Sequence, residues 1–264
     1  MTAPTLARSG APATAARRTP PPAALLRSEA LLFLREPVNL ILVAALPVAL
    51  VAGFGLIPGF GDPDPGLGGQ SGTEFIASLG VGVVIAALGL MVLPGTLGSY
   101  RERGVLKRLH TTPARPAYLL LAQLAVYGVA VLVSLVLIVA VAAGAFGVAL
   151  PRNLPLFGVS VALGTTALLS LGLLVAALAP SAKAAQGLGM VLFFPSMFLG
   201  GVYVPRDAFP HALQVVSDLT PLGATIEAVR DSWMGDVPRP VHLVTMAAYA
   251  AVASLVAAKS FRWE

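Results

Sequence analysis

Long apolar runs alternate with short polar or Gly- and Pro-rich stretches along most of this chain. Six of the runs are about 18 to 24 residues long, which is enough for a helix to cross a hydrocarbon layer of ~30 Å. They cover residues 38–57, 75–97, 118–141, 156–179, 184–204 and 241–258. The pattern predicts an all-α fold, a polytopic membrane protein with six transmembrane helices.

The first 22 residues differ from the rest because they consist mostly of Ala, Pro, Thr and Arg. Such a stretch cannot bury enough apolar surface to fold. We therefore expect a disordered cytoplasmic tail at 1–22 and a transmembrane domain at 23–264. The first apolar run is about 20 residues long, beyond the roughly 7–15 residues of a signal-peptide core. We interpret it as a membrane span rather than a cleaved signal.

Residues 23–36 predict a helix that lies along the membrane surface. At roughly 100° per residue, one side of this helix is mainly apolar and another is polar. The apolar side carries Leu26, Ala30, Phe33 and Leu34. An amphipathic helix of this kind fits the interface between headgroups and acyl chains. The alternative is a cytoplasmic extension of the first span, and Pro37 marks the break before that span.

Residues 205–240 are less apolar than the runs on either side and contain several charged side chains. A spanning helix here would bury those charges in lipid and would invert the C-terminus. Pro210 and Pro221 divide the stretch into two short helices. We expect a re-entrant or outward-facing helical hairpin that caps the outer mouth of a pathway, with Glu227 and Arg230 paired at i, i+3.

Composition and charge give the orientation. Hydrophobic residues make up 57% of the chain and charged residues 11%, which is typical of an integral membrane protein. With both termini in the cytoplasm, 13 of the 17 Lys and Arg residues lie on the inner side. This distribution obeys the positive-inside rule. The net charge of +5 is therefore an orientation signal rather than evidence for nucleic-acid binding.

Several function classes lack their usual residues. No Asp, Glu, His, Lys or Arg lies well inside any predicted span, so the sequence does not favour an ion-driven carrier or a voltage sensor. The chain has no Cys, no HExxH and no GxSxG motif. It also has no GxxxxGK[ST] loop, so energy from ATP would have to arrive through a partner.

The segment 101–113, RERGVLKRLHTTP, is a basic polar stretch between two of the apolar runs, and it is the most prominent polar feature of the chain. We expect a short helix whose cations pair with acidic groups on a partner and whose Val105, Leu106 and Leu109 form an apolar ridge. Gly104 would let another backbone approach, and Pro113 would end the helix. The alternative is a basic loop that only touches lipid headgroups.

Two stretches resemble ABC-2 type transporter permeases. The first is RERGVLKRLHTTP, in which the matching positions are Glu102, Arg103, Gly104, Leu106, Arg108, Leu109, Thr112 and Pro113. Val105 departs from the pattern, where Thr is usual. The second resembles the segment after span 5 of the drug-exporting, daunorubicin-like branch, through Gly201, Pro205, Pro210, Leu213, Pro221, Leu222 and Arg230. The resemblance covers about residues 23–264.

The resemblance implies that residues 101–109 form a coupling helix that docks on a separate P-loop ABC ATPase subunit. The coupling positions would be Arg101, Glu102, Arg103, Gly104, Leu106, Lys107, Arg108 and Leu109. Two permeases and two ATPases would make a multidrug efflux transporter in the bacterial cytoplasmic membrane, surrounded by lipid. This chain would bind no cofactor itself, and ATP and Mg²⁺ would bind to the partner.

The resemblance also implies that spans 2 and 5 face the axis of a homodimer and line the route. A soft apolar wall for a lipophilic drug, natural product or lipid-linked compound would then be formed by Phe193, Phe194, Met197 and Phe198. The alternative function is a non-transport scaffold or channel-like protein whose basic loop binds anionic lipid.

Overall fold

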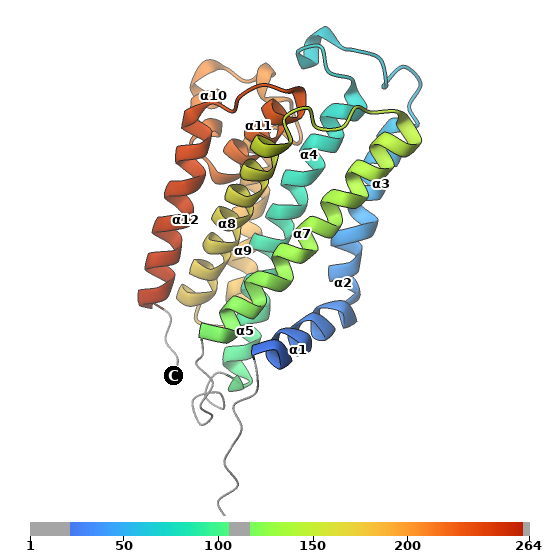
Figure 1. Ribbon diagram of the computed structural model, residues 1–264. Helices are drawn as coiled ribbons and strands as arrows, with labels where there is room; N and C mark the ends of the chain where they lie inside the picture. The colour runs from blue at the N-terminus through green and yellow to red at the C-terminus, as the bar shows by residue number, and fades with distance from the viewer. Residues whose placement is uncertain (1–21, 106–116, 261–264) are drawn as a thin grey trace, which may run out of the picture.

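The structure is a computed structural model, which describes residues 22–105 and 117–260 (Figure 1). Within these residues, six helices are long and apolar enough to cross a membrane, and no β-strand is present. The spans are Pro37–Gly55, Gly72–Glu102, Tyr118–Phe146, Leu154–Leu178, Ala182–Leu199 and Pro240–Ser260. The predicted all-α polytopic fold is confirmed, with span boundaries that move by at most five residues.

The first span consists of α2 (Pro37–Leu40), the π-helical turn η1 (Ile41–Ala45) and α3 (Leu46–Gly55). Pro47 explains the wide turn, because proline lacks an N–H and its ring crowds the carbonyl four residues earlier. That carbonyl belongs to Val43, and it accepts a hydrogen bond of 2.5 Å from the Ser134 hydroxyl on α7 (Ala117–Phe146). A neighbouring helix thus supplies a partner for a backbone group that water cannot reach in lipid.

The second span lies at the centre of the molecule and comprises α4 (Gly72–Ala86), the π-helical η3 (Ala87–Val92) and α5 (Leu93–Glu102). Most of its side chains are buried inside the chain, against α3, α7, α8 (Leu154–Leu178), α9 (Ala182–Leu199) and α11 (Pro221–Met234). Span 2 therefore leaves little surface for a second copy, and the expectation that spans 2 and 5 together face a dimer axis is not supported for span 2. Span 5, α9, is mostly exposed.

The helices α8 and α9 approach the central span through glycine. A Cβ added to Gly172 would overlap the carbonyl oxygen of Gly89, and one added to Gly189 would overlap the carbonyl oxygen of Leu90. These contacts have the small-residue character expected of helices that pack closely in lipid. Pro94 lies four residues after Leu90, so the same carbonyl would lack its usual N–H partner in a regular α-helix.

The N-terminal helix α1 (Pro22–Arg35) is separate from the first span, and it crosses the lower end of the bundle at an angle to α2 (Figure 1). Its buried residues are Glu29 and Phe33, whereas Leu26 and Leu34 are exposed. The predicted apolar side was therefore wrong in part. The helix turns its one acidic side chain toward the protein and leaves four leucines on the surface, namely Leu26, Leu31, Leu32 and Leu34.

The opposite end carries the short helices η2 (Pro65–Leu67), η4 (Arg206–Ala208), α10 (His211–Asp218) and α11. The break between α10 and α11 lies at the predicted Pro221, where the Thr220 hydroxyl caps α11 by accepting a hydrogen bond from the amide of Gly223. The final helix, α12 (Pro240–Ser260), runs back along α8 to the end that carries α1.

Candidate functional site

The end of span 2 enters the segment that was predicted to couple to a partner, and its first two charges bond within the chain. The Arg101 guanidinium donates to the carbonyls of Ala176, at 3.4 Å, and Ala179, where α8 ends. The Glu102 Oε1 accepts from the amide of Ala182, at 2.8 Å, where α9 begins. A cation at a helix C-terminus and an anion at an N-terminus both match the helix dipoles.

We call this arrangement the α8–α9 clamp, defined by Arg101 and Glu102 and the turn 179–182 that they hold. Contact of both side chains with a partner stays a prediction, and the bonds within the chain are a second role for them. The expected helix does not run unbroken from Arg101, because α5 ends at Glu102 and Gly104 adopts a left-handed backbone with φ of 65°. Glycine suits this conformation because it has no Cβ, so Gly104 ends α5 here, and the close approach of a partner's backbone at this position stays a prediction.

The remaining predicted coupling residues divide into two groups. Arg103 is exposed at the end of α5. Beyond Val105 the predicted positions lie outside the described residues, namely Leu106, Lys107, Arg108 and Leu109, as does Pro113. The tail at 1–21 also lies outside them.

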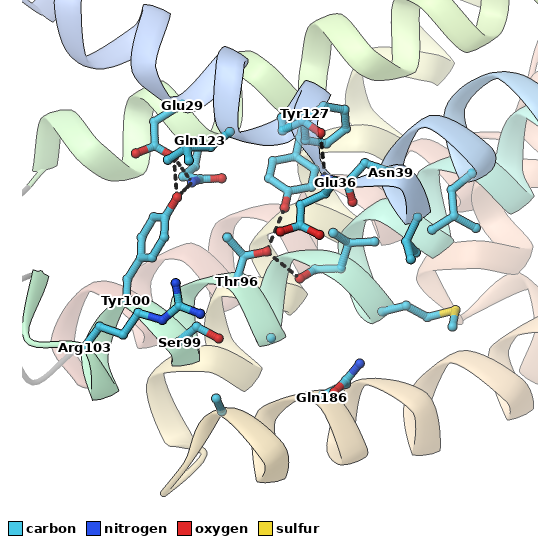
Figure 2. A pocket seen from close by; sticks show the side chains of 18 of the residues that line it. Glu29, Glu36, Asn39, Thr96, Ser99, Tyr100, Arg103, Gln123, Tyr127 and Gln186 are labelled. Carbon is cyan, nitrogen blue, oxygen red and sulfur yellow. Dashed lines mark hydrogen bonds between the residues drawn. The ribbon is translucent and has the colours of Figure 1, made fainter.

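Beside the clamp, a cleft of about 540 Å³ opens between α1, the first span, α5, α7 and the start of α9 (Figure 2). Its walls combine apolar side chains, among them Leu32, Leu42, Met91 and Met190, with polar ones. Three exposed charged residues line it as well: Glu36, Arg103 and Lys183. A cleft with both kinds of wall suits an amphiphilic molecule better than a purely polar one.

A hydrogen-bonded group at one end of the cleft joins three helices. The Glu29 carboxylate of α1 accepts a 2.7 Å bond from the Tyr100 hydroxyl of α5 and a second bond from the Gln123 amide of α7. Figure 2 shows the three side chains converging. Glu29 is 6% exposed. Burial raises the pKa of its carboxyl, and the two hydrogen bonds oppose that shift.

A second contact lies along the same wall. The Thr96 and Tyr127 hydroxyls are 3.3 Å apart, and the Tyr127 ring packs edge-on against Phe33. The Asn39 amide donates to the Phe33 carbonyl at 3.1 Å, close to the break between α1 and α2. These contacts connect α1 and the start of the first span to span 2 and α7, which shapes this side of the cleft.

The predicted apolar wall on span 5 is not a single surface. Phe193 and Met197 are buried, whereas Phe194 and Phe198 are 54% and 41% exposed. Positions i and i+4 share a face of a helix, so the two pairs point to different sides of α9. The first pair belongs to the core of the chain. Only Phe194 and Phe198 lie on a surface that a substrate or second copy could contact.

Sequence reasoning missed the cleft because its residues come from five separate elements. One signal was present. Glu29 is the only acidic residue between positions 1 and 35, and it interrupts an otherwise apolar and basic helix. An acidic side chain in such a setting needs a partner from elsewhere in the fold.

The other predicted site residues lie at the opposite end. Arg230 Nη1 is 3.8 Å from Glu227, but its shorter contacts are with Asp207 at 3.2 Å, Gln70 at 2.8 Å and the Leu67 carbonyl at 3.0 Å. Arg230 thus ties α11 to the loops at this end. Burial raises the pKa of Glu227, and the nearby Arg230 opposes that shift. Among the described residues, no cluster of His, Asp and Glu has a metal-binding arrangement.

Comparisons with known proteins agree on the kind of protein. A family model described as ABC-2 type transporter matches residues 23–234. The inner membrane transport permease YhhJ of Escherichia coli (strain K12) is 31% identical over 134 residues, which are 49% of this chain and 35% of that relative. The protein of the same name from Shigella flexneri matches to the same extent.

This chain spans about a third of the length of those curated relatives. The family model, in contrast, matches most of the chain, including both segments in which the resemblance was noted. Together with the six apolar helices, the match shows that this chain is an integral membrane protein and belongs to the ABC-2 type transporter family.

Proposed function

We propose that this chain is the permease subunit of an ATP-driven exporter in the bacterial cytoplasmic membrane. Family membership supports a transport role, and both similar relatives are named as inner membrane transport permeases. Export, and the drug-exporting branch in particular, is supported by the resemblance of residues 197–231 noted above. The substrate is a lipophilic drug, natural product or lipid-linked compound that moves by alternating access.

The observation that carries the proposal is the position of the basic segment. It leaves α5 at the end of the bundle where α1, the α8–α9 turn and the end of α12 also lie (Figure 1). These parts and the segments that adjoin them in sequence hold 13 of the 17 Lys and Arg residues, so the positive-inside rule favours a cytoplasmic location for this end. The segment therefore begins, at Arg101, on the side where a soluble ATPase would bind.

The energy source follows from what the sequence contains. No P-loop motif occurs in the 264 residues, so this chain would obtain work from ATP only through another subunit. We propose two copies of this chain and two P-loop ATPases, with ATP and Mg²⁺ bound by the ATPases. The exposed face of α9, which carries Phe194 and Phe198, is the side of span 5 open to the second copy.

The proposal is tested by reversing two charges in the coupling segment, Arg103→Glu with Lys107→Glu. Opposite charges attract the two subunits, so reversal should abolish co-purification of the ATPase and the substrate-stimulated hydrolysis. The matched control is Arg27→Glu with Arg35→Glu, which changes the net charge equally at two exposed positions of α1. The control should retain both properties.

Two results would contradict the proposal. One is unchanged co-purification and hydrolysis in the Arg103→Glu, Lys107→Glu protein. The other is a wild-type protein that functions in cells lacking every ATPase that purifies with it. That second result would favour a scaffold or channel-like protein whose basic loop holds anionic lipid.

A further inference from the structure

Glu29 is a buried carboxylate in the cleft, and its partners are neutral. Both of its hydrogen bonds, from Tyr100 and Gln123, go to the same oxygen, Oε2. In the described part of the chain, Oε1 accepts no hydrogen bond, and no Lys, Arg or His lies within ion-pair distance of Glu29. The negative charge of Glu29 is therefore stabilised by the dipoles of two neutral donors at Oε2. Oε1 has no protein donor among these residues.

Such an arrangement is costly for the protein alone. Removing a carboxylate from water without an opposite charge is unfavourable, and two neutral donors compensate for only part of the loss. The raised pKa of Glu29 has this origin. A cationic ligand beside Oε1 would restore the missing charge pair in a poorly solvated place, where an ion pair is stronger than at the surface.

The rest of the cleft indicates what would carry that cation. Apolar side chains from α1, η1, η3 and α9 form its walls, and the volume of about 540 Å³ is that of a site for a drug-sized molecule. The cleft cations, Arg103 and Lys183, are exposed, and neither forms an ion pair with Glu29. An apolar body with one cationic group would therefore meet apolar walls and place its cation beside the Glu29 carboxylate.

We propose that Glu29 recognises the cationic nitrogen of the transported compound, and that the substrates of this protein are lipophilic amines. The proposal rests on the transport role proposed above and specifies its substrate class. An anionic lipid headgroup is the competing occupant, because Arg103 and Lys183 could hold a phosphate. Glu29 and Glu36 would repel that phosphate, whereas both favour an amine.

The test uses two fluorescent probes that differ in one charge. Dansylcadaverine has an apolar ring system and a primary amine, and its N-acetyl derivative has the same body without the charge. Binding of each to the purified full-length protein in phosphatidylcholine nanodiscs is measured by fluorescence anisotropy. The wild-type protein should bind the amine roughly ten- to a hundredfold more tightly, the range expected for a hydrogen bond to a charged group.

The variant Glu29→Gln keeps the size of the side chain and an oxygen that accepts from Tyr100. It should weaken binding of the amine to the level of the acetylated probe and leave the acetylated probe unaffected. The matched control is Glu74→Gln, which neutralises another buried carboxylate at the far end of α4. That control should retain the preference for the amine.

Three binding results would overturn the amine site. One is equal binding of the two probes by the wild-type protein. The second is equal weakening of the binding of both probes by Glu29→Gln. The third is a Glu29→Gln protein that still binds the amine more tightly than the acetylated probe, by the same factor as the wild-type protein. The first comparison needs no variant, so it stands even if Glu29→Gln does not fold. Export of the acetylated probe as fast as the amine by the permease and its ATPase would refute the amine site alone and leave the exporter role intact.

Discussion

At the scale of single residues, charged side chains at both ends of the bundle bond mainly within the chain. Arg101 holds the end of α8, Arg230 joins α11 to two loops, and Arg206 forms two hydrogen bonds with Asp218, at 2.9 and 2.8 Å. Lipid covers the apolar middle of the helices, so ionic contacts can order the loops only at these polar ends. Counting charges predicts which end faces the cytoplasm, but it does not predict these partners.

Asp218 offers a pH-dependent prediction. Burial alone would raise the pKa of its carboxyl, but hydrogen bonds from Arg206 and His242 and the charge of Arg239 hold the pKa below its ordinary value. A lowered pKa stabilises the folded state above the unfolded pKa of about 3.9, and this contribution is lost as the pH falls through the folded value. We expect Asp218→Asn to cost about 1.5–3 kcal/mol at pH 7.

The measurement is the melting temperature of the detergent-solubilised protein as a function of pH. The gap between the wild-type protein and Asp218→Asn should stay constant down to about pH 5 and close below about pH 4. Asp236→Asn, at an exposed position, is the control and should melt like the wild-type protein at every pH. A gap that persists unchanged at pH 3 would show that the charge of Asp218 is not the cause.

At the scale of helices, proline and glycine decide how the spans pack. Pro47 and Pro94 each follow a π-helical turn, and the carbonyl four residues before each proline faces another helix. For Val43 the contact is the Ser134 hydroxyl, and for Leu90 it is the bare backbone of Gly189. The spans therefore meet through backbone groups as well as through apolar side chains, as polar atoms in lipid require.

Replacing Gly189 tests this packing. In Gly189→Ala the new methyl group would overlap the Leu90 carbonyl oxygen, so α9 must move away from the central span. We expect a loss of about 1–3 kcal/mol, the usual cost of overpacking. Gly187→Ala lies two residues away on the same helix, where nothing is within 4 Å of an added Cβ. It should leave the melting temperature unchanged or raise it, and equal losses in both variants would refute the close contact.

The spans could be predicted from the sequence because their signal is local. An apolar run of about 20 residues indicates a helix whatever its neighbours are. The faces of the helices could not be predicted in the same way. Helix α1 turns Glu29 inward because Tyr100 and Gln123, some 70 and 94 positions later, supply its hydrogen bonds. Leu26 and Leu34 remain exposed, which costs little where lipid replaces water.

The site was predictable to the same limited extent. The basic segment stands out in the sequence, and so do the proline breaks of the α10–α11 hairpin. That Arg101 and Glu102 bond to the α8–α9 turn depends on contacts between positions about 80 residues apart. Whether Phe193 or Phe194 is buried depends on how α9 is rotated about its own axis. The local sequence pattern predicts neither the contacts of Arg101 and Glu102 nor this rotation.

At the scale of the whole molecule, the clamp joins the coupling segment to the cleft. The chain leaves α5 at Glu102 and enters the coupling segment, and the same residue bonds to the first amide of α9. One and two turns further along, α9 contributes Gln186 and Met190 to the cleft wall. A force applied to the segment would therefore move α5 and the start of α9 together, and with them one side of the cleft.

Breaking the clamp should separate docking of the ATPase from transport. In Arg101→Ala with Glu102→Ala, the exposed Arg103 and the segment after it are retained, so the ATPase should still co-purify. Stimulation of its hydrolysis by substrate should fall on the order of fivefold or more, because the coupling free energy between two sites is commonly of that size. Basal hydrolysis should stay within about twofold of the wild-type value, since no ATPase residue has changed.

Arg35→Ala removes an exposed arginine from the same end and serves as the control, with full stimulation expected. Loss of co-purification in the double variant would instead place these two residues on the docking surface, and unchanged stimulation would show that force reaches the cleft by another route.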